Sequence, residues 1–225
     1  MAIVILLTIL TVVFLPGIRA QYVLSKHSRE RTEIPGTGGE LAEHLIKACG
    51  LDEVKLERID KGDHYDPISK TVRLSAPNFD KKSLTAITVA AHEVGHAIQD
   101  HIGYSPLRAR TNLVKFAQIA EKFGALVLVA LPVVTVLSRT PVVGFASFIV
   151  GLGILLVPVL VHLVTLPVEF DASFNRALPI LDDRYVPSDE MPAVRSILRA
   201  CALTYVAASL ATLLNVWRWI AILRR

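Results

Sequence analysis

Apolar residues are concentrated in four blocks along this 225-residue chain. The blocks cover residues 2–18, 123–137, 142–168 and 200–223. All 20 Asp and Glu residues fall in the polar stretches between them, at 19–122 and 169–199. A membrane-spanning helix needs about 20 predominantly apolar residues. The pattern therefore predicts four transmembrane helices, with both polar stretches on the same side of the membrane.

The first polar stretch carries the patterns of short helices and strands. Apolar positions repeat with a helical period over residues 39–48, and a glycine follows where a helix would end. Residues 54–59 and 71–74 read as two short strands on either side of a turn at DHYDP, residues 63–67. Two short strands are not stable alone, so we expect them to pack on the helices.

The run SLTAITVAA, which leads into the sequence HEVGHAIQ, consists entirely of helix-compatible residues. Asp80 or Ser83 is placed to cap this helix at its N-terminus, and Gly103 to end it. His92 and His96 are four residues apart, so they lie on the same helix face and can bind one metal ion. Neutral imidazole is a good ligand for Zn²⁺, and a catalytic zinc takes three protein ligands and leaves one position open.

Glu93 completes the pattern His-Glu-x-x-His, which is a zinc hydrolase signature when it lies on a helix. We expect Glu93 to take a proton from a zinc-activated water and to pass it to the leaving amine. The third ligand must come from elsewhere in the chain. Glu169 is the candidate, because it is the first acid after a long apolar run and a carboxylate at a membrane edge is functional by default. The alternative is an interfacial carboxylate that only marks the membrane boundary.

Other runs along the chain extend this motif: DHYDP, VRLS, GYSPLRAR, TLPVEFDAS and ALTYVAA. In this order, over nearly the whole chain, they resemble the neutral zinc metallopeptidases of bacterial membranes, the YugP-like family. The resemblance implies a membrane-embedded zinc endopeptidase of the gluzincin-like kind, distantly similar in layout to the HtpX-type membrane proteases. It also implies one Zn²⁺ per chain, held by His92, His96 and Glu169.

Further residues are candidates for supporting roles. In HtpX-type proteases an aspartate follows the glutamate ligand by four residues and orients a metal-bound histidine, whereas Ser173 holds that position here. The candidates to accept a hydrogen bond from the second ring nitrogen of a ligand histidine are Asp171, Ser173 and Asn175. The candidates for oxyanion or substrate contacts are His64, Tyr65 and Arg176. Arg176 could instead pair with an acid in the site.

The predicted fold class is a mainly α membrane protein with about four transmembrane helices and a small α+β zinc-peptidase domain on one side of the membrane. Its segments are an anchor at 1–20, a soluble metallopeptidase region at 21–122, a transmembrane hairpin at 123–168, a soluble helical segment at 169–199 and a C-terminal transmembrane helix at 200–225. No positive residue precedes the first apolar run, which favours an anchor over a cleaved secretory signal. Lys and Arg gather in the polar stretches, and the positive-inside bias then predicts a multi-pass bacterial cell-membrane protein with a cytoplasmic active site.

We expect this protein to hydrolyse peptide bonds in membrane-associated or misfolded proteins, with a polypeptide substrate and the lipid bilayer as partners. The net charge of +4 gives no reason to expect nucleic acid. An intramembrane protease is excluded because only about a dozen apolar residues precede His92, too few to span. A non-catalytic zinc-binding membrane scaffold or chaperone-like protein is the alternative, although a closed structural site would need a fourth ligand. Oligomeric state is left open, and manganese or cobalt also suits these ligands.

Overall fold

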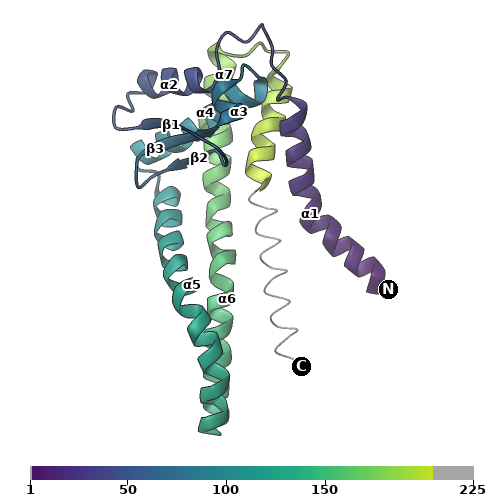
Figure 1. The fold of residues 1–225 in the computed structure, drawn as a ribbon, viewed down its shortest axis with the longest axis vertical. Coiled ribbons are helices and arrows are strands. Elements are labelled where there is room, and N and C mark those ends of the chain that lie inside the picture. The colour runs from purple at the N-terminus through teal and green to yellow at the C-terminus, as the bar shows by residue number, and fades with distance from the viewer. Residues whose placement is uncertain (1, 205–225) are drawn as a thin grey trace.

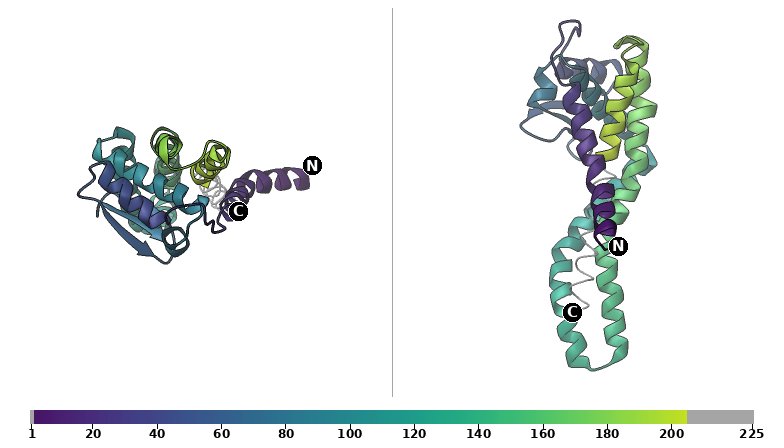
Figure 2. Two further views of the ribbon diagram at one scale, coloured as in Figure 1. Left: turned by 90° about the horizontal axis from the view of Figure 1, so that it is seen from above. Right: turned by 90° about the vertical axis from the view of Figure 1, so that its right-hand side faces the viewer.

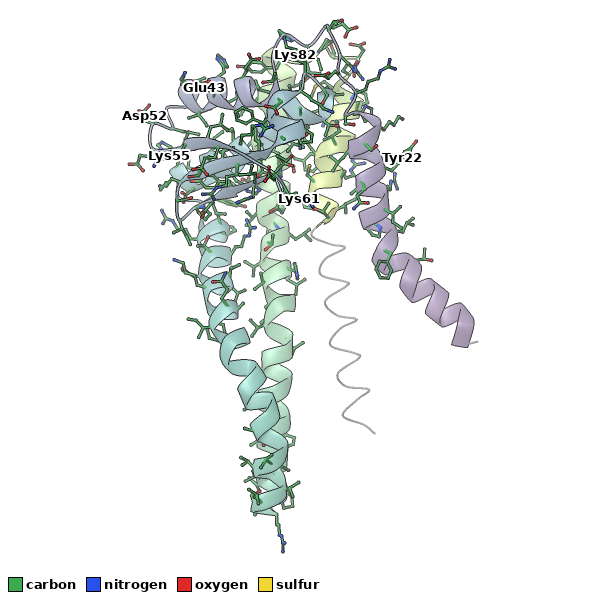
Figure 3. All side chains as sticks on the ribbon, in the orientation of Figure 1. Tyr22, Glu43, Asp52, Lys55, Lys61 and Lys82 are labelled. Atoms are coloured by element: carbon green, nitrogen blue, oxygen red, sulfur yellow. The ribbon has the colours of Figure 1, made fainter. Side chains whose placement is uncertain are left out.

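The computed structural model describes residues 2–204 and shows a small α/β unit at one end of a long helical hairpin (Figure 1). The hairpin consists of α5, Ser105–Ser138, and α6, Pro141–Phe170. Arg139 joins the two helices in a left-handed conformation, with φ 50°. The hairpin extends well beyond the α/β unit (Figure 2). Charged side chains such as Glu43, Lys55 and Lys61 are exposed on the periphery of that unit (Figure 3).

Two helices of the α/β unit begin at caps that the chain itself provides. α2, Gly38–Ala48, starts with a capping box in which Thr37 and Glu40 each bond the backbone N–H of the other. α4, Leu84–His101, starts at Ser83, whose hydroxyl accepts a hydrogen bond from the third residue of the helix at 3.1 Å. Both predicted helices are confirmed, and Ser83 rather than Asp80 is the cap of the second.

The sheet has three strands in the order β1–β3–β2: β1, Lys55–Ile59, β2, His64–Asp66, and β3, Thr71–Ser75. β3 is parallel to β1 and antiparallel to β2. The two predicted strands are confirmed, but DHYDP was wrongly expected to be only a turn, because its central residues form β2. Three residues are too short for an alternation pattern to be recognised.

The hydrophobic core is formed by the sheet, α2, α4 and apolar residues of the segment 177–198. Val72 and Leu74 of β3 and Val94 of α4 are fully buried in it, and each such side chain contributes about 1.5–3 kcal/mol by leaving water. The end of α1, Ala2–Lys26, is tied to the same unit because Thr85 donates from its side chain to the Leu24 carbonyl.

α6 does not end at the α/β unit. It continues into η1, a π-helix at Asp171–Ala177, and then into α7, Leu178–Arg184, and residues 191–204 are again helical. η1 packs directly on α4. A Cβ added to Gly95 would lie 2.8 Å from the Ala172 carbonyl oxygen, so the two backbones touch at this glycine. π-helical turns are rare in proteins, and those that do occur often lie at functional sites.

The prediction of four transmembrane helices is wrong. Across the residues that the structure describes, no helix is both long enough and apolar enough to cross a membrane. The prediction treated each apolar block as an element of its own, whereas residues 123–137 are only the second part of α5, whose first turns carry Arg108, Arg110 and Lys115. The predicted last span lies outside the described residues beyond residue 204. The predicted multi-pass topology and cytoplasmic orientation depended on these spans, so the structure gives them no support.

The contact of α4 with η1 predicts that Gly95→Ala lowers the free energy of unfolding by about 1–3 kcal/mol, because the new methyl group overpacks the interface. Denaturant unfolding measures this change. The matched control is Gly153→Ala in α6, where an added Cβ meets no atom within 4 Å. In a helix interior that change is neutral or stabilises by up to about 1 kcal/mol. Equal stability of the two variants would contradict the close approach of the two backbones.

Candidate metal centre

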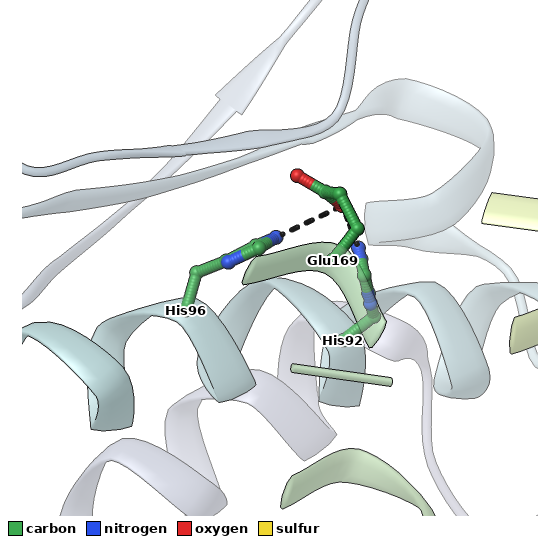
Figure 4. A group of neighbouring side chains, drawn as sticks. All are labelled: His92, His96 and Glu169. Atoms are coloured by element: carbon green, nitrogen blue, oxygen red, sulfur yellow. Dashed lines mark ion pairs between the residues drawn. The ribbon is translucent and has the colours of Figure 1, made fainter. Parts of the chain in front are cut away.

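The three predicted metal ligands meet at one point in the structure. His92 and His96 project from the same face of α4, with ring centroids 4.8 Å apart. One carboxylate oxygen of Glu169, Oε2, lies 3.3 Å from Nε2 of each ring (Figure 4). The three side chains are buried, and their ligand atoms lie within 4.8 Å of one another. The end of α6 therefore brings Glu169 to the face of α4 that carries both histidines.

The second ring nitrogen of His96 is held by Gln99. His96 Nδ1 lies 3.0 Å from the amide oxygen of Gln99. The amide nitrogen of Gln99 donates to the Val168 carbonyl at 2.9 Å and to Asp171 Oδ2 at 2.8 Å. Because both acceptors fix the direction of the amide, its oxygen must accept from His96 Nδ1–H. The lone pair of His96 Nε2 then faces Glu169.

Asp171 anchors this arrangement through three side-chain donors. Besides Gln99, Asn175 donates to Oδ1 at 2.9 Å, and the Arg176 guanidinium donates to Oδ2 at 3.2 Å. Burial alone raises the pKa of Asp171, but these donors lower it more, so its pKa falls below the ordinary value. Of the two roles considered for Arg176, the structure places it in the ion pair with an acid of the site.

The second ring nitrogen of His92 is held by Ser173. His92 Nδ1 lies 3.1 Å from the Ser173 hydroxyl, which in turn lies 3.4 Å from the Leu198 carbonyl. A hydroxyl has one proton to donate. The Leu198 carbonyl oxygen can only accept a hydrogen bond, so the Ser173 proton is directed to it. Ser173 therefore accepts from His92 Nδ1–H, which leaves the lone pair of His92 Nε2 facing Glu169. Of the three residues predicted for this role, Ser173 is the one whose side chain contacts a ligand histidine directly.

Nε2 of His92, Nε2 of His96 and Oε2 of Glu169 thus point their lone pairs toward one another, with no proton between them. Within the described part of the chain, neither carboxylate oxygen of Glu169 has a hydrogen-bond partner, although the side chain is fully buried. A buried carboxylate without compensation is strongly unfavourable. A cation at this point would satisfy the carboxylate and both imidazoles together. Two imidazoles and one carboxylate are a donor set of catalytic zinc, so these residues fit Zn²⁺.

Glu93 lies beside this centre and is 6% exposed. With His92 it lines a cavity of about 340 Å³. Burial raises the pKa of Glu93 to about 7, and the negative charges of Glu169 and Asp63 act in the same direction. A carboxylate with a pKa near neutrality can both accept and return a proton. Cys201 lines the same cavity, and burial raises the pKa of its thiol, which keeps it in the neutral form.

The structure does not place His64 or Tyr65 in this cavity. His64 is exposed on β2, with its Nδ1 at 2.8 Å from the Gly62 carbonyl. Tyr65 donates its hydroxyl to Asp100 at 2.8 Å and lines a separate cavity with Ala97. Neither contact supports the predicted role in oxyanion or substrate binding.

Two residues of the site were missed in the sequence. Gln99 could have been found, because it follows His96 by three residues on a helix and such pairs are neighbours on its surface. Arg110 of α5 has its Nη1 at 3.8 Å from Oε1 of Glu169, the oxygen that faces away from the imidazoles. No local pattern reveals Arg110, because its place depends on how α5 packs beside α6.

Two imidazoles and a buried glutamate around one point, next to a second carboxylate, are an arrangement typical of metal-dependent hydrolases. Comparison with known proteins agrees. The family model described as "Putative neutral zinc metallopeptidase" matches residues 2–224, and the chain belongs to this family. The chain is also similar to "Putative membrane protease YugP" of Bacillus subtilis (strain 168), with 35% identity over 202 residues, 88% of this chain and 85% of the relative. No solved structure matches the chain. The predicted resemblance to the YugP-like zinc metallopeptidases is confirmed.

The contacts of Gln99 predict that Gln99→Leu weakens zinc binding about 10–100-fold, because His96 loses the acceptor that fixes its tautomer. Competition titration with a chromophoric chelator measures the zinc affinity. Gln118→Leu makes the same substitution at an exposed position of α5 and is expected to leave the affinity unchanged. Wild-type affinity in a folded Gln99→Leu protein would show that the amide does not hold the ligand.

Proposed function

We propose that this protein is a zinc-dependent endopeptidase in which His92, His96 and Glu169 hold the metal ion and Glu93 is the general base and acid. One observation carries the proposal: a buried carboxylate and two imidazoles converge with no proton between them. Family membership supports the same reaction. The described residues supply three ligands, which suits an open catalytic site better than the closed, four-ligand site of a structural scaffold.

Each residue has a distinct task in peptide hydrolysis. When bound, zinc polarises the peptide carbonyl and lowers the pKa of a water molecule. Glu93 takes the proton of the attacking water and passes it to the leaving amine, and its pKa of about 7 suits both transfers. Gln99 and Ser173 keep both imidazoles in the tautomer with a free Nε2. Arg110 offers a positive charge to the outer oxygen of Glu169.

A polypeptide substrate would bind along the sheet. The strand order leaves β2 at an edge, and Asp63, the residue before it, lines the cavity that contains Glu93. A peptide that adds to the free edge of β2 would be held mainly by its backbone. Backbone recognition suits extended chains of varied sequence, so we infer that unfolded or misfolded polypeptides are the substrates.

The similar protein of Bacillus subtilis is named a membrane protease, and we propose that the lipid bilayer is a partner of this protein as well. After cell lysis, the full-length protein is expected to sediment with the membrane fraction and to need detergent for release. Recovery in the supernatant without detergent would contradict this part of the proposal and leave the chemistry untouched.

The assignment of Glu93 predicts that Glu93→Gln binds zinc like the wild type but cleaves unfolded casein about 10²–10⁴-fold more slowly, because it cannot accept the proton. Glu169→Ala is the matched contrast, since it is expected to lose both zinc and cleavage. Metal analysis and a casein cleavage assay in detergent measure the two properties. A chelator should abolish wild-type cleavage, and added zinc should restore it.

Three results would count against the proposal. Equal cleavage by wild type and Glu93→Gln would remove Glu93 from its role. Full zinc content in Glu169→Ala would remove the third ligand. Inactivity of the zinc-loaded wild type would favour the scaffold.

A further inference from the structure

The cavity beside Glu93 is built from several separate parts of the chain. Its wall is formed by the end of α1, the residue before β2, the last residue of β3, the short helix α3, Ala76–Asp80, α4 and the helical segment 191–204. Its volume of about 340 Å³ is sufficient for a large side chain. His92 and Glu93 form one side of it, so a group in the cavity lies next to the reacting atoms of the proposed peptidase.

The described side chains that line this cavity include acidic groups but no Lys or Arg. Leu24, Pro77 and Val89 provide apolar surface. Small neutral groups fill much of the rest: Ser25, Ser28, Ser75, Thr85, Cys201 and Thr204. The charged groups among the described lining residues are two carboxylates, Asp63 and Glu93, and neither Lys nor Arg is among them.

Asp63 is held in the wall by neutral donors. Its Oδ1 accepts from the backbone N–H of Ser75 at 2.7 Å and from the Ser75 hydroxyl at 2.8 Å. Its Oδ2 accepts from the Asn78 amide at 2.8 Å. These bonds fix the carboxylate in place. Because all three donors are neutral, they leave its negative charge uncompensated.

We propose that this cavity is the subsite for a substrate side chain next to the scissile bond, and that Asp63 makes it select against acidic side chains. The inference rests on the proposed peptidase function and adds its specificity. An acidic side chain would enter a partly desolvated space beside the fixed carboxylate of Asp63, and like charges repel there. A peptide paired along β2 passes Asp63, and its alternate side chains point to one face, which brings one of them to the cavity.

The test uses two peptides that differ only in charge. Cleavage sites of the wild type in unfolded casein, mapped by mass spectrometry, are expected to lack Asp and Glu at one position beside the cut. Matched peptides with Gln or Glu at that position then give kcat/KM, and fluorescence anisotropy gives their Kd independently of cleavage. The wild type is expected to favour Gln at least about tenfold in both quantities.

Asp63→Asn is the variant that tests the residue. Asn keeps the shape and can still accept from Ser75, and the Asn78 amide can turn to offer its oxygen. The preference for Gln is expected to fall severalfold, while the Gln peptide is still cut. Asn78→Lys, which keeps a donor to Asp63 and adds a positive charge, should shift the preference in the same direction. Asp60→Asn, in the same loop but outside the cavity, should leave the preference unchanged.

The outcomes separate the subsite from the proposed function. Equal use of the two peptides by the wild type, or an unchanged preference in folded Asp63→Asn and Asn78→Lys proteins, would overturn the subsite and leave the peptidase intact. Binding that prefers Gln without any cleavage would support the subsite and contradict the peptidase.

Discussion

The structure depends on the burial of one negative charge against two imidazoles. The side chain of Glu169 is fully buried, and its carboxylate oxygens have no hydrogen-bond partner among the described residues. Such a group is tolerated only where a cation compensates it. The close contact of α4 with η1 at Gly95 sets this geometry, because it brings the end of α6 to the helix face that carries His92 and His96.

The surroundings of this charge divide into two functional sides. On one side, neutral and charged polar groups fix the ligands: Gln99 and Ser173 hold the imidazoles, and Asp171 holds Gln99. On the other side, Glu93 faces a cavity lined by the ends of α1 and β3, by α3 and by the helical segment 191–204. In the proposed peptidase, the hydrogen-bonded side would hold the metal ligands in place, and the cavity would admit the substrate.

Local elements of the α/β unit were predictable because their causes are local. The capping box at Thr37 and the cap at Ser83 begin α2 and α4 where the sequence indicates. β2 was missed because three residues gain strand structure only by pairing with β3. The membrane spans were wrong for a related reason: the apolar content of a block says little about the helix that contains it, as α5 shows by joining such a block to a charged beginning.

The chain alone specifies the reactive core of the site, because His92, Glu93 and His96 sit within two turns of one helix and their spacing places them. It also marks Glu169 as the acid that follows a long apolar run. The partners of these residues came only with the folded structure. Ser173 contacts a histidine 81 positions earlier, Arg110 reaches Glu169 from another helix, and Asp63 lines a cavity shared with α4. Such contacts depend on how distant elements pack, and no periodicity along the chain records that packing.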